Sequence, residues 1–260
     1  PRNSNLSFLK KNSFNGIINS DNYKDNSVII KISDWNQNSS YIKFRLKSVD
    51  TKSTETSYQG IEILTNQDYT LNKNSSIIEI DKNTFYDDLL LNISYNSDTL
   101  DLGKEKDPFR SSVRVKLPHK ITDTIRLRQS FIGKIINERI SYLSSKKNDS
   151  FIYTNTSSLG KYIISRDTLK PEIIPINFKS NSNIKGKRSL RLRLKDELSG
   201  IKSYSSYFNG NWALFEYEPK SNLIFHNLSD GVIENGENEL IIKYEDGVGN
   251  KGVYKSKIYY

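Results

Sequence analysis

Cysteine and methionine are both absent from this chain of 260 residues, and histidine occurs only twice. Without cysteine the chain has no disulfide framework, no thiol nucleophile and no Cys-based zinc site. His119 and His226 lie 107 residues apart (226 − 119) and belong to no HxH or HExxH pattern. The usual ligand set of a zinc hydrolase is therefore excluded. No GxSxG sequence occurs, which excludes a nucleophile elbow of the serine-hydrolase kind.

The chain also lacks long apolar runs and an initial methionine. No run approaches the roughly 20 apolar residues that cross a bilayer, so we expect no transmembrane segment. No signal peptide opens the chain, and the first residues are PRNSN, whereas a translated chain normally begins with methionine. We therefore expect a fragment or a processed product of a longer protein, with any export signal upstream of residue 1.

Positive charge is in modest excess, with 39 basic against 30 acidic residues and a net charge of +9. Such an excess favours anionic surroundings such as nucleic acid, membrane headgroups or acidic cell-wall polymers, without choosing among them. Basic residues at alternate positions would form a cationic surface, or would serve solubility and the protection of sheet edges. Because RNP-like aromatics and a helix-turn-helix are missing, we expect no nucleic-acid partner. The basic positions are Lys43, Arg45, Lys47, Arg114, Lys116, Arg126, Arg128, Arg191, Arg193 and Lys195.

Alternation of apolar and polar residues is the dominant pattern that is present. In SLRLRLK (189–195) every second residue is leucine and the residues between them are basic. The same scheme recurs at residues 41–47, 112–117 and 124–129. It predicts strands with one buried face, joined by turns rich in Asn, Asp, Gly and Ser. The 16 tyrosines and 11 phenylalanines set among these runs argue against disorder. We predict an all-β fold of tandem immunoglobulin-like β-sandwich domains.

An internal repeat links two distant hairpins. Placing Asp34 on Asp246 (246 − 34 = 212) also places Asn38 on Asn250 and aligns the β-branched runs before each Asp. Upstream, NGI (15–17) roughly corresponds to DGV (230–232). Asp and Asn suit the two ends of a tight connection, because they hydrogen-bond nearby backbone and tolerate left-handed conformations. Calcium binding is the alternative, but one Asp and one Asn supply too few of the 6–8 oxygens that calcium prefers.

The repeat predicts the domain organisation, because each hairpin would close one sandwich. Residues 48–60 are polar and read as a linker or loop. Pro171 and Pro175 flank the expected first strand of the last domain, which should lie at a sheet edge. We predict the end of a truncated β-sandwich at 1–50, a second β-sandwich at 51–166 and a C-terminal immunoglobulin-like β-sandwich at 167–260.

The stretch SYSSYFNGNWALFEYE (203–218) offers aromatic residues for ligand contact. One interpretation is a sugar-stacking platform, while a Trp in a sandwich strand more often anchors the core. We therefore expect Trp212 to be buried and NGN (209–211) to form a hairpin turn. The possible ligand-contact residues are Tyr204, Tyr207, Trp212 and Tyr217.

No residue of the chain is assigned a catalytic or metal-binding role. Asp87 and Asp88 are adjacent, and adjacent strand residues point to opposite faces, so they would not flank one glycosidic bond together. We expect them to form a turn before an apolar strand at 89–93. His119 follows a proline at an expected strand end, and His226 lies in an apolar hairpin. We predict structural or solvated roles for both histidines.

The order of several motifs resembles the C-terminal region of M23-family (lysostaphin-like) zinc peptidases from Bacteroidetes. In residues 158–260 the shared features are DTxxP, a strand ending in D-x-L-SGI-x-SY, NGxW…EYxxK and a closing D-x-x-GN hairpin. NTFYDDLLLNI (83–93) and DPFRSSVRVKL (107–117) resemble the preceding domain of those proteins. The hairpin of Asp34 resembles the domain before that one. The resemblance covers nearly the whole chain and is densest after residue 158.

Members of that family cleave peptide cross-links in peptidoglycan with a zinc held by two His and one Asp, and no such set exists here. The resemblance implies a non-catalytic accessory region, inactive alone and without a cofactor. Zinc is expected only in a catalytic domain upstream of residue 1. The implied partners are that peptidase domain and peptidoglycan or another envelope polymer, in an exported protein of the periplasm or outer envelope. Two alternatives remain: an independent carbohydrate-binding or adhesive module, and a degenerate homologue that lost its catalytic domain.

Overall fold

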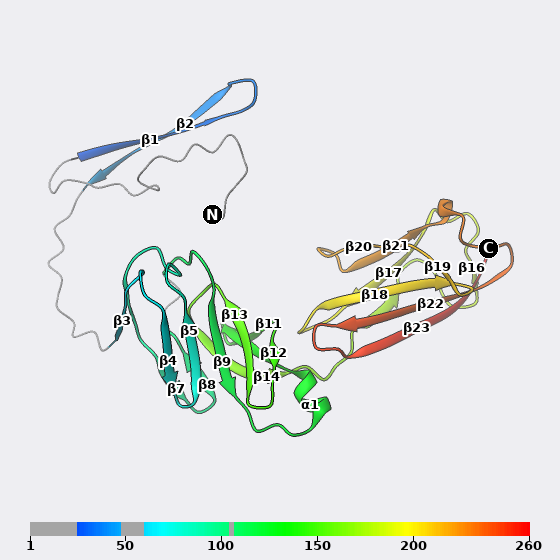
Figure 1. Cartoon of the computed structure of the whole chain (residues 1–260). Coiled ribbons are helices and arrows are strands. Elements are labelled where there is room, and N and C mark those ends of the chain that lie inside the picture. The colour runs from blue at the N-terminus through cyan, green and yellow to red at the C-terminus, as the bar shows by residue number, and fades with distance from the viewer. Residues whose placement is uncertain (1–24, 48–59, 104–106) are drawn as a thin grey trace. The chain divides into compact units, whose positions relative to one another are not determined.

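The computed structural model describes residues 25–47, 60–103 and 107–260, in two units that divide between Gln59 and Gly60 (Figure 1). The expected linker at 48–60 lies outside the described residues except for Gly60, and so does the NGI sequence at 15–17.

The first unit contributes one hairpin, formed by β1 (Asp25–Ser33) and β2 (Ser39–Lys47). Its antiparallel register places Ile30 opposite Ile42 and Val28 opposite Phe44. Since side chains alternate between the faces of a strand, these four residues share one apolar face. The predicted strand, connection and returning strand are confirmed.

Residues 60–167 form a β-sandwich of two five-stranded sheets with an accessory strand pair. One sheet has the order β11-β10-β14-β8-β7, the other has the order β12-β13-β9-β5-β4, and β3 pairs with β6. Its strands are β3 (Ile61–Ile63), β4 (Tyr69–Lys73), β5 (Ser76–Ile80), β6 (Leu89–Leu91), β7 (Ser94–Asn96), β8 (Thr99–Asp101), β9 (Val113–Pro118), β10 (Ser130–Ile136), β11 (Arg139–Leu143), β12 (Lys146–Lys147), β13 (Phe151–Thr156) and β14 (Lys161–Arg166).

The core of this sandwich is built from the alternating residues that the sequence pattern identifies. Ile78 of β5, Val115 of β9 and Ile152 of β13 pack with Leu100 of β8 and Ile132 of β10, and all five are fully buried. Burying a side chain of this size contributes about 1.5–3 kcal/mol relative to exposing it. The two sheets therefore hold together through the apolar face that each of them presents.

The prediction of a strand at 124–129 is wrong, because Thr124–Gln129 forms the helix α1. Its alternating Ile and Leu satisfy a strand pattern, yet Ile125 is exposed and only Leu127 packs against the core. The preceding Asp123 decides the local structure: its carboxylate accepts a hydrogen bond from Arg126 N at 2.6 Å, as a helix N-cap does. No strand pairs with this segment among the described residues.

Residues 168–260 form a second sandwich, with sheets in the orders β15-β17-β21-β20 and β16-β23-β22-β18-β19. β15, which contains Pro175 and follows Pro171, is an edge strand as predicted. The elements are β15 (Glu172–Pro175), β16 (Ser182–Asn183), β17 (Ser189–Lys195), β18 (Ile201–Phe208), β19 (Asn211–Trp212), β20 (Glu216–Glu218), β21 (Leu223–Asn227), the 3-10 turn η1 (Leu228–Asp230), β22 (Glu237–Asp246) and β23 (Lys251–Tyr259).

The core of the second sandwich is also built from alternate apolar residues of its strands. Leu190, Leu192 and Leu194 of β17 are fully buried and pack with Ile242 of β22 and Ile258 of β23. The all-β class predicted from alternation is thus confirmed in both sandwiches. The described part of the chain contains no helix of the length and apolarity needed to span a membrane.

Candidate binding surface of the C-terminal sandwich

β18 organises the candidate surface, because its residues alternate between the core and the solvent. Ser206 and Phe208 are buried, whereas Ser205 and Tyr207, which alternate with them, are half-buried. The strand turns into β19 through Asn209 and Gly210, whose φ angles of 50° and 83° are both left-handed. Asn-Gly is the pair that a two-residue hairpin turn prefers. The hairpin turn predicted at 209–211 is confirmed.

Trp212 lies on the outer face of the sheet and not in the core. It is directly opposite Tyr207 across β18 and β19, and its exposed fraction is 62%. The expected burial of Trp212 is therefore wrong. The physical reason is that Phe208 and Phe215 fill the adjacent core, while Trp212 ends a two-residue edge strand.

Tyr207 and Trp212 form what we call the aromatic platform. The ammonium of Lys243 lies 5.6 Å from the centroid of the Tyr207 ring, a distance at which a cation is attracted to the ring face. Ser205 is opposite Lys243 in the adjoining register of β18 and β22. The platform therefore joins two aromatic rings to hydroxyl and ammonium groups on one face of the sheet.

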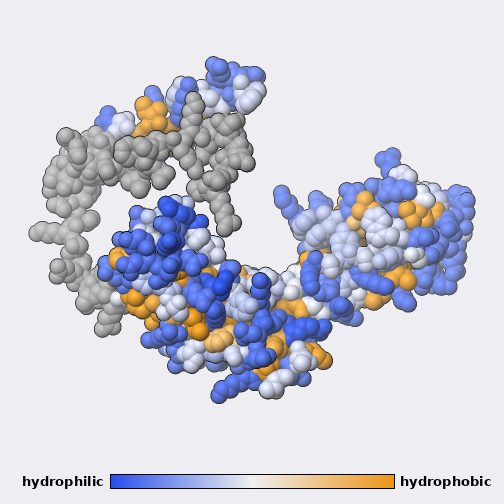
Figure 2. All heavy atoms as spheres, viewed as in Figure 1, coloured by the Kyte–Doolittle hydropathy of each residue, from blue (hydrophilic) through white to orange (hydrophobic). Residues whose placement is uncertain are grey.

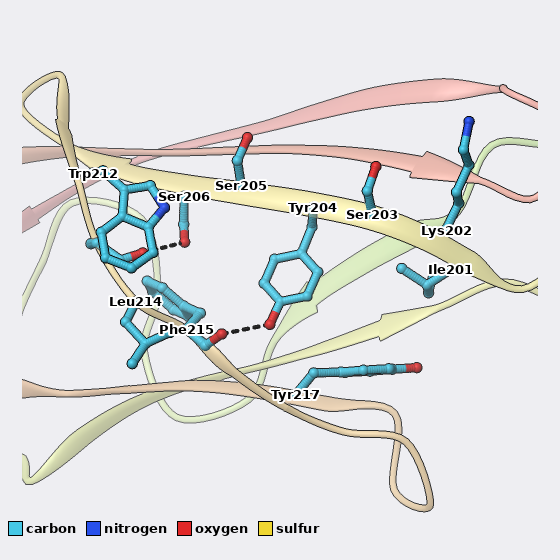
Figure 3. A pocket seen from close by; sticks show the side chains of 11 residues that line it. Ile201, Lys202, Ser203, Tyr204, Ser205, Ser206, Trp212, Leu214, Phe215 and Tyr217 are labelled. Atoms are coloured by element: carbon cyan, nitrogen blue, oxygen red, sulfur yellow. Dashed lines mark hydrogen bonds between the residues drawn. The ribbon is translucent and has the colours of Figure 1, made fainter.

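Tyr204 and Tyr217 line an adjoining cavity, the edge groove, which has a volume of about 380 Å³ and shares Trp212 with the platform. Figure 3 shows Tyr204 and Ser206 projecting from β18 toward the segment that carries Leu214 and Phe215. The groove is lined by residues 201–206 and by residues 212–215 and 217. Of the four predicted ligand-contact aromatics, it thus gathers Tyr204, Trp212 and Tyr217 and leaves Tyr207 on the outer face.

The side chains inside the groove are held in place by hydrogen bonds to the opposite wall. The hydroxyl of Tyr204 donates to Phe215 O at 2.5 Å, and that of Ser206 donates to Ala213 O at 2.7 Å. The rings of Tyr204 and Tyr217 meet edge to face, with centroids 6.1 Å apart. Burial raises the pKa of the Tyr204 hydroxyl, and the nearby Tyr217 and Glu216 add to the rise. The groove is a preformed cavity.

Both histidines have structural environments, as predicted. His226 is buried, its ring stacks on Phe215 with centroids 5.2 Å apart, and its Nδ1 donates to Leu214 O at 2.8 Å. His119 lies in the first sandwich, where Nε2 donates to Asn148 O at 2.8 Å. Neither imidazole lies in the groove or on the platform.

Three carboxylates lie close together near the start of the second sandwich, a feature that the sequence analysis missed. Oxygen atoms of Asp167, Asp196 and Asp246 all lie within 4.8 Å of one another. Five of the six oxygens already accept hydrogen bonds from N–H groups, and among the described residues only Oδ1 of Asp196 has no donor. Calcium requires 6–8 oxygens, whereas these carboxylate oxygens mostly accept hydrogen bonds from backbone N–H groups. The three aspartates are therefore better suited to holding the loops in place than to binding an ion. Burial raises the pKa of Asp196, and the charges of Asp167 and Asp246 add to the rise.

The acidic pair lies in the connection before β6, where Asp87 is in a bend and no hydrogen-bonded turn of the described residues includes either of them. Asp87 and Asp88 precede β6, and Oδ1 of Asp88 accepts a hydrogen bond from Thr65 N at 2.6 Å. The apolar strand that follows is shorter than expected and covers Leu89–Leu91.

The basic residues of the first sandwich lie on different elements, and two of them pair with an acid. Arg114 pairs with Glu79 at 3.2 Å, Lys116 also contacts Glu79, and Arg126 and Arg128 lie on α1. Figure 2 shows hydrophilic residues interspersed with hydrophobic ones over the visible surface of both sandwiches. Part of the expected positive charge of this sandwich is thus neutralised locally by Glu79.

These features define residues 60–260 as one compact unit with two β-sandwiches, the second with an exposed aromatic pair and a groove at a sheet edge. Residues 63–167 match the Zu5-like domain family, so the first sandwich is similar to that domain. No curated protein matches the chain.

Among solved structures, the endo-β-1,4-mannanase from Thermotoga petrophila is similar over 36% of this chain and 20% of that one. The sequence identity is 16% and the TM-score 0.31. This chain thus spans a fifth of the length of that protein, and so slight a likeness carries no functional argument.

Proposed function

We propose that this chain is a non-catalytic binding region whose C-terminal sandwich docks on a saccharide polymer through the aromatic platform. The observation that carries the proposal is the 62% exposure of Trp212 beside Tyr207. A large aromatic ring left in water retains apolar area that a ligand can bury. The C–H face of a sugar ring is flat and apolar, so it complements an exposed indole.

The polar groups around the platform suit the rest of a sugar. Ser205 and the hydroxyl of Tyr207 both donate and accept hydrogen bonds, whereas Lys243 only donates. Small numbers of polar groups beside aromatic side chains are typical of small-molecule sites. An ammonium on the platform further favours polymers that carry carboxylates over neutral ones.

The wider role follows from the resemblance of residues 158–260 to the accessory region of M23-family peptidases. We propose that the chain belongs to an exported protein and positions such a zinc peptidase domain on peptidoglycan at the cell envelope. Zinc chemistry belongs to that domain in this proposal, and the present chain supplies attachment. An independent adhesive module would use the same platform without a peptidase partner.

Co-sedimentation with insoluble peptidoglycan, chitin and mannan tests the attachment. We expect Trp212→Ala and Tyr207→Ala each to weaken binding to at least one polymer by about tenfold or more, as for an interface hot spot. Trp35→Ala is the matched control, because Trp35 is 90% exposed on the other unit. Unchanged binding by the two platform variants would refute the platform.

The non-catalytic role and the identity of the polymer are tested separately. A zymogram of the 260-residue chain on peptidoglycan should show no clearing, and clearing would contradict the absence of catalysis. Platform-dependent binding to chitin or mannan but not to peptidoglycan would favour the independent module.

A further inference from the structure

The strand β18 has an edge that is only partly paired. Along one side it pairs with β22 for its whole length, whereas along the other it pairs with β19 only at Tyr207 and Phe208. From Ile201 to Ser205, no described strand lies against that second side. Five extended residues correspond to about 16 Å of open edge.

Hydrogen bonds elsewhere in β18 show which backbone groups face this open side. Ala213 N donates to Ser206 O at 2.9 Å on the β19 side, and Asn209 N donates to Glu239 O at 3.0 Å on the β22 side. Backbone groups of successive residues point alternately to the two sides of a strand. Tyr204, two residues before Ser206, therefore directs its N–H and C=O into the edge groove, where no described strand pairs with them.

The opposite wall of the groove is also at a sheet edge. β20 is the last strand of its sheet, and Tyr217 of β20 faces Tyr204 across the groove. The side-chain hydroxyls of Tyr204 and Ser206 are already bonded to this wall. The backbone N–H and C=O of Tyr204 are left unpaired by any described strand, and an extended peptide can pair with both in the geometry of a sheet ladder.

The charged residues around the groove indicate the charge of the ligand that it would accept. Glu216 and Glu218 flank Tyr217 on β20, both are exposed, and neither makes an ion pair with a described residue. Lys202 at the end of the groove is neutralised by Glu245 at 2.7 Å. Because side chains alternate along a strand, both carboxylates lie on the outer face of β20, opposite to Tyr217 and outside the groove lining. The β20 edge beside the groove therefore carries two negative charges.

We propose that the edge groove binds an extended basic segment of a partner polypeptide, which adds as a strand beside β18 at Tyr204. Main-chain hydrogen bonds would supply affinity and alternate side chains would supply selectivity, as in other cases of strand addition. An apolar residue of the segment contacts Tyr204 and Tyr217, and a Lys or Arg approaches Glu216 or Glu218. This interaction goes beyond saccharide docking and does not depend on it.

The test uses the full chain, labelled with ¹⁵N, and the blocked peptide acetyl-Lys-Val-Thr-Val-Lys-Val-Lys-amide. We expect binding by fluorescence anisotropy and slowing of the Tyr204 amide exchange by about tenfold or more, since strand pairing protects amides. A copy of the peptide N-methylated at alternate residues, which cannot complete the ladder on that side, should bind at least about tenfold more weakly. Equal binding by the methylated peptide, or unchanged exchange at Tyr204, would overturn the proposal.

Protein variants separate strand addition from general electrostatic attraction. Glu216→Lys/Glu218→Lys should weaken peptide binding at least about tenfold, because two attractive charges become repulsive. Glu172→Lys/Glu239→Lys is the matched control at two other exposed acidic positions of the same sandwich, and it should bind as the wild type does. Tyr207→Ala should leave the Tyr204 protection intact, because Tyr207 lies on the platform and does not line the groove. Protection of Tyr204 by a polysaccharide and not by the peptide would assign the groove to saccharide and refute the strand.

Discussion

Asp246 and Asn250 close the last hairpin through both oxygens of the aspartate: Oδ1 accepts from Asn250 N at 2.8 Å and Oδ2 accepts from Asn250 Nδ2 at 2.7 Å. Asp34 and Asn38 make the same two bonds at 2.9 and 2.8 Å. In both hairpins the aspartate N–H also donates to the asparagine carbonyl, at 3.1 and 3.0 Å. The sequence repeat is therefore a structural repeat, down to its side-chain bonds.

The two copies differ in what surrounds them, which gives a first prediction. Asn250 is buried and also bonds to the carbonyls of Asp167 and Leu169 and to Gln129. Asn250→Ala leaves these groups unpaired, so we expect a loss of about 2–4 kcal/mol in the free energy of unfolding. Urea unfolding followed by circular dichroism measures the loss.

Asn38→Ala is the internal control for this prediction. Asn38 and Asp34 are both exposed, so solvent replaces the lost bonds and the unfolding of residues 60–260 should change by less than about 0.5 kcal/mol. Equal effects of the two substitutions would show that burial does not set the importance of this turn.

Much of the fold was predictable because alternation reports directly on burial. The pattern at 189–195 coincides with β17, whose three leucines are buried. At 124–129 the same pattern failed, since Asp123 caps a helix and no described strand offers pairing. Alternation describes one strand, whereas helix capping and strand pairing depend on neighbours that a pattern does not contain.

The candidate site was predictable in composition but not in arrangement. The sequence contains the four predicted ligand-contact aromatics within residues 203–218, but it does not indicate which of them face outward and which line the groove. That distinction depends on the register of β18 with β19, which places Tyr207 opposite Trp212. The cluster of Asp167, Asp196 and Asp246 joins segments far apart in the chain, so its only sequence signal was the Asp–Asn hairpin and the DELSG turn.

A second prediction concerns Gly252, which lies opposite Tyr244 in the register of β22 and β23. A Cβ at this position would lie 2.2 Å from Cε2 of the Tyr244 ring, and Tyr244 is only 7% exposed. Gly252→Ala should therefore displace the ring and cost about 1–3 kcal/mol in the free energy of unfolding, measured by urea titration.

Two comparisons isolate the steric cause of that effect. Adding Tyr244→Leu to Gly252→Ala should recover part of the loss, which a double-mutant cycle detects as non-additivity. Ser40 occupies the equivalent position of the first hairpin, opposite Ile32, and Ser40→Ala should be close to neutral. Strict additivity at Gly252 and Tyr244 would argue against a clash between them.

A third prediction concerns the stability that Glu79 contributes to the fold and its dependence on pH. The hydrogen bond from Lys116 lowers the pKa of Glu79 below 4.5, and the charges of Lys116 and Arg114 lower it further. A lowered pKa in the folded state contributes stability that is present above the ordinary value and lost as pH falls through the folded value. The melting temperature of Glu79→Gln should therefore lie below that of the wild type at pH 7 and approach it near pH 3. A constant difference across this range would assign the effect to packing.

A fourth prediction concerns Asp196, whose pKa shift is opposite in direction to that of Glu79. Burial is the main cause that raises its pKa above 3.8 in the folded state, and the carboxylates of Asp167 and Asp246 contribute. A raised acidic pKa means that the folded state binds the proton more tightly than the unfolded state does. Stability therefore increases as pH falls through the folded value, and the gain is complete below the ordinary one.

Asp196→Asn tests that sign directly. The amide oxygen can still accept the hydrogen bonds from Leu198 N and Gly200 N, while the negative charge is removed. We expect the melting temperature to rise at pH 7 by about 1–3 °C, a small shift because solvent screens a partly exposed carboxylate. The advantage should shrink as the wild type becomes protonated in acid. Asp149→Asn removes an exposed carboxylate in another loop and should produce no such convergence. A variant that is less stable than the wild type at pH 7 would mean that the charge of Asp196 holds its turn more strongly than its neighbours repel it.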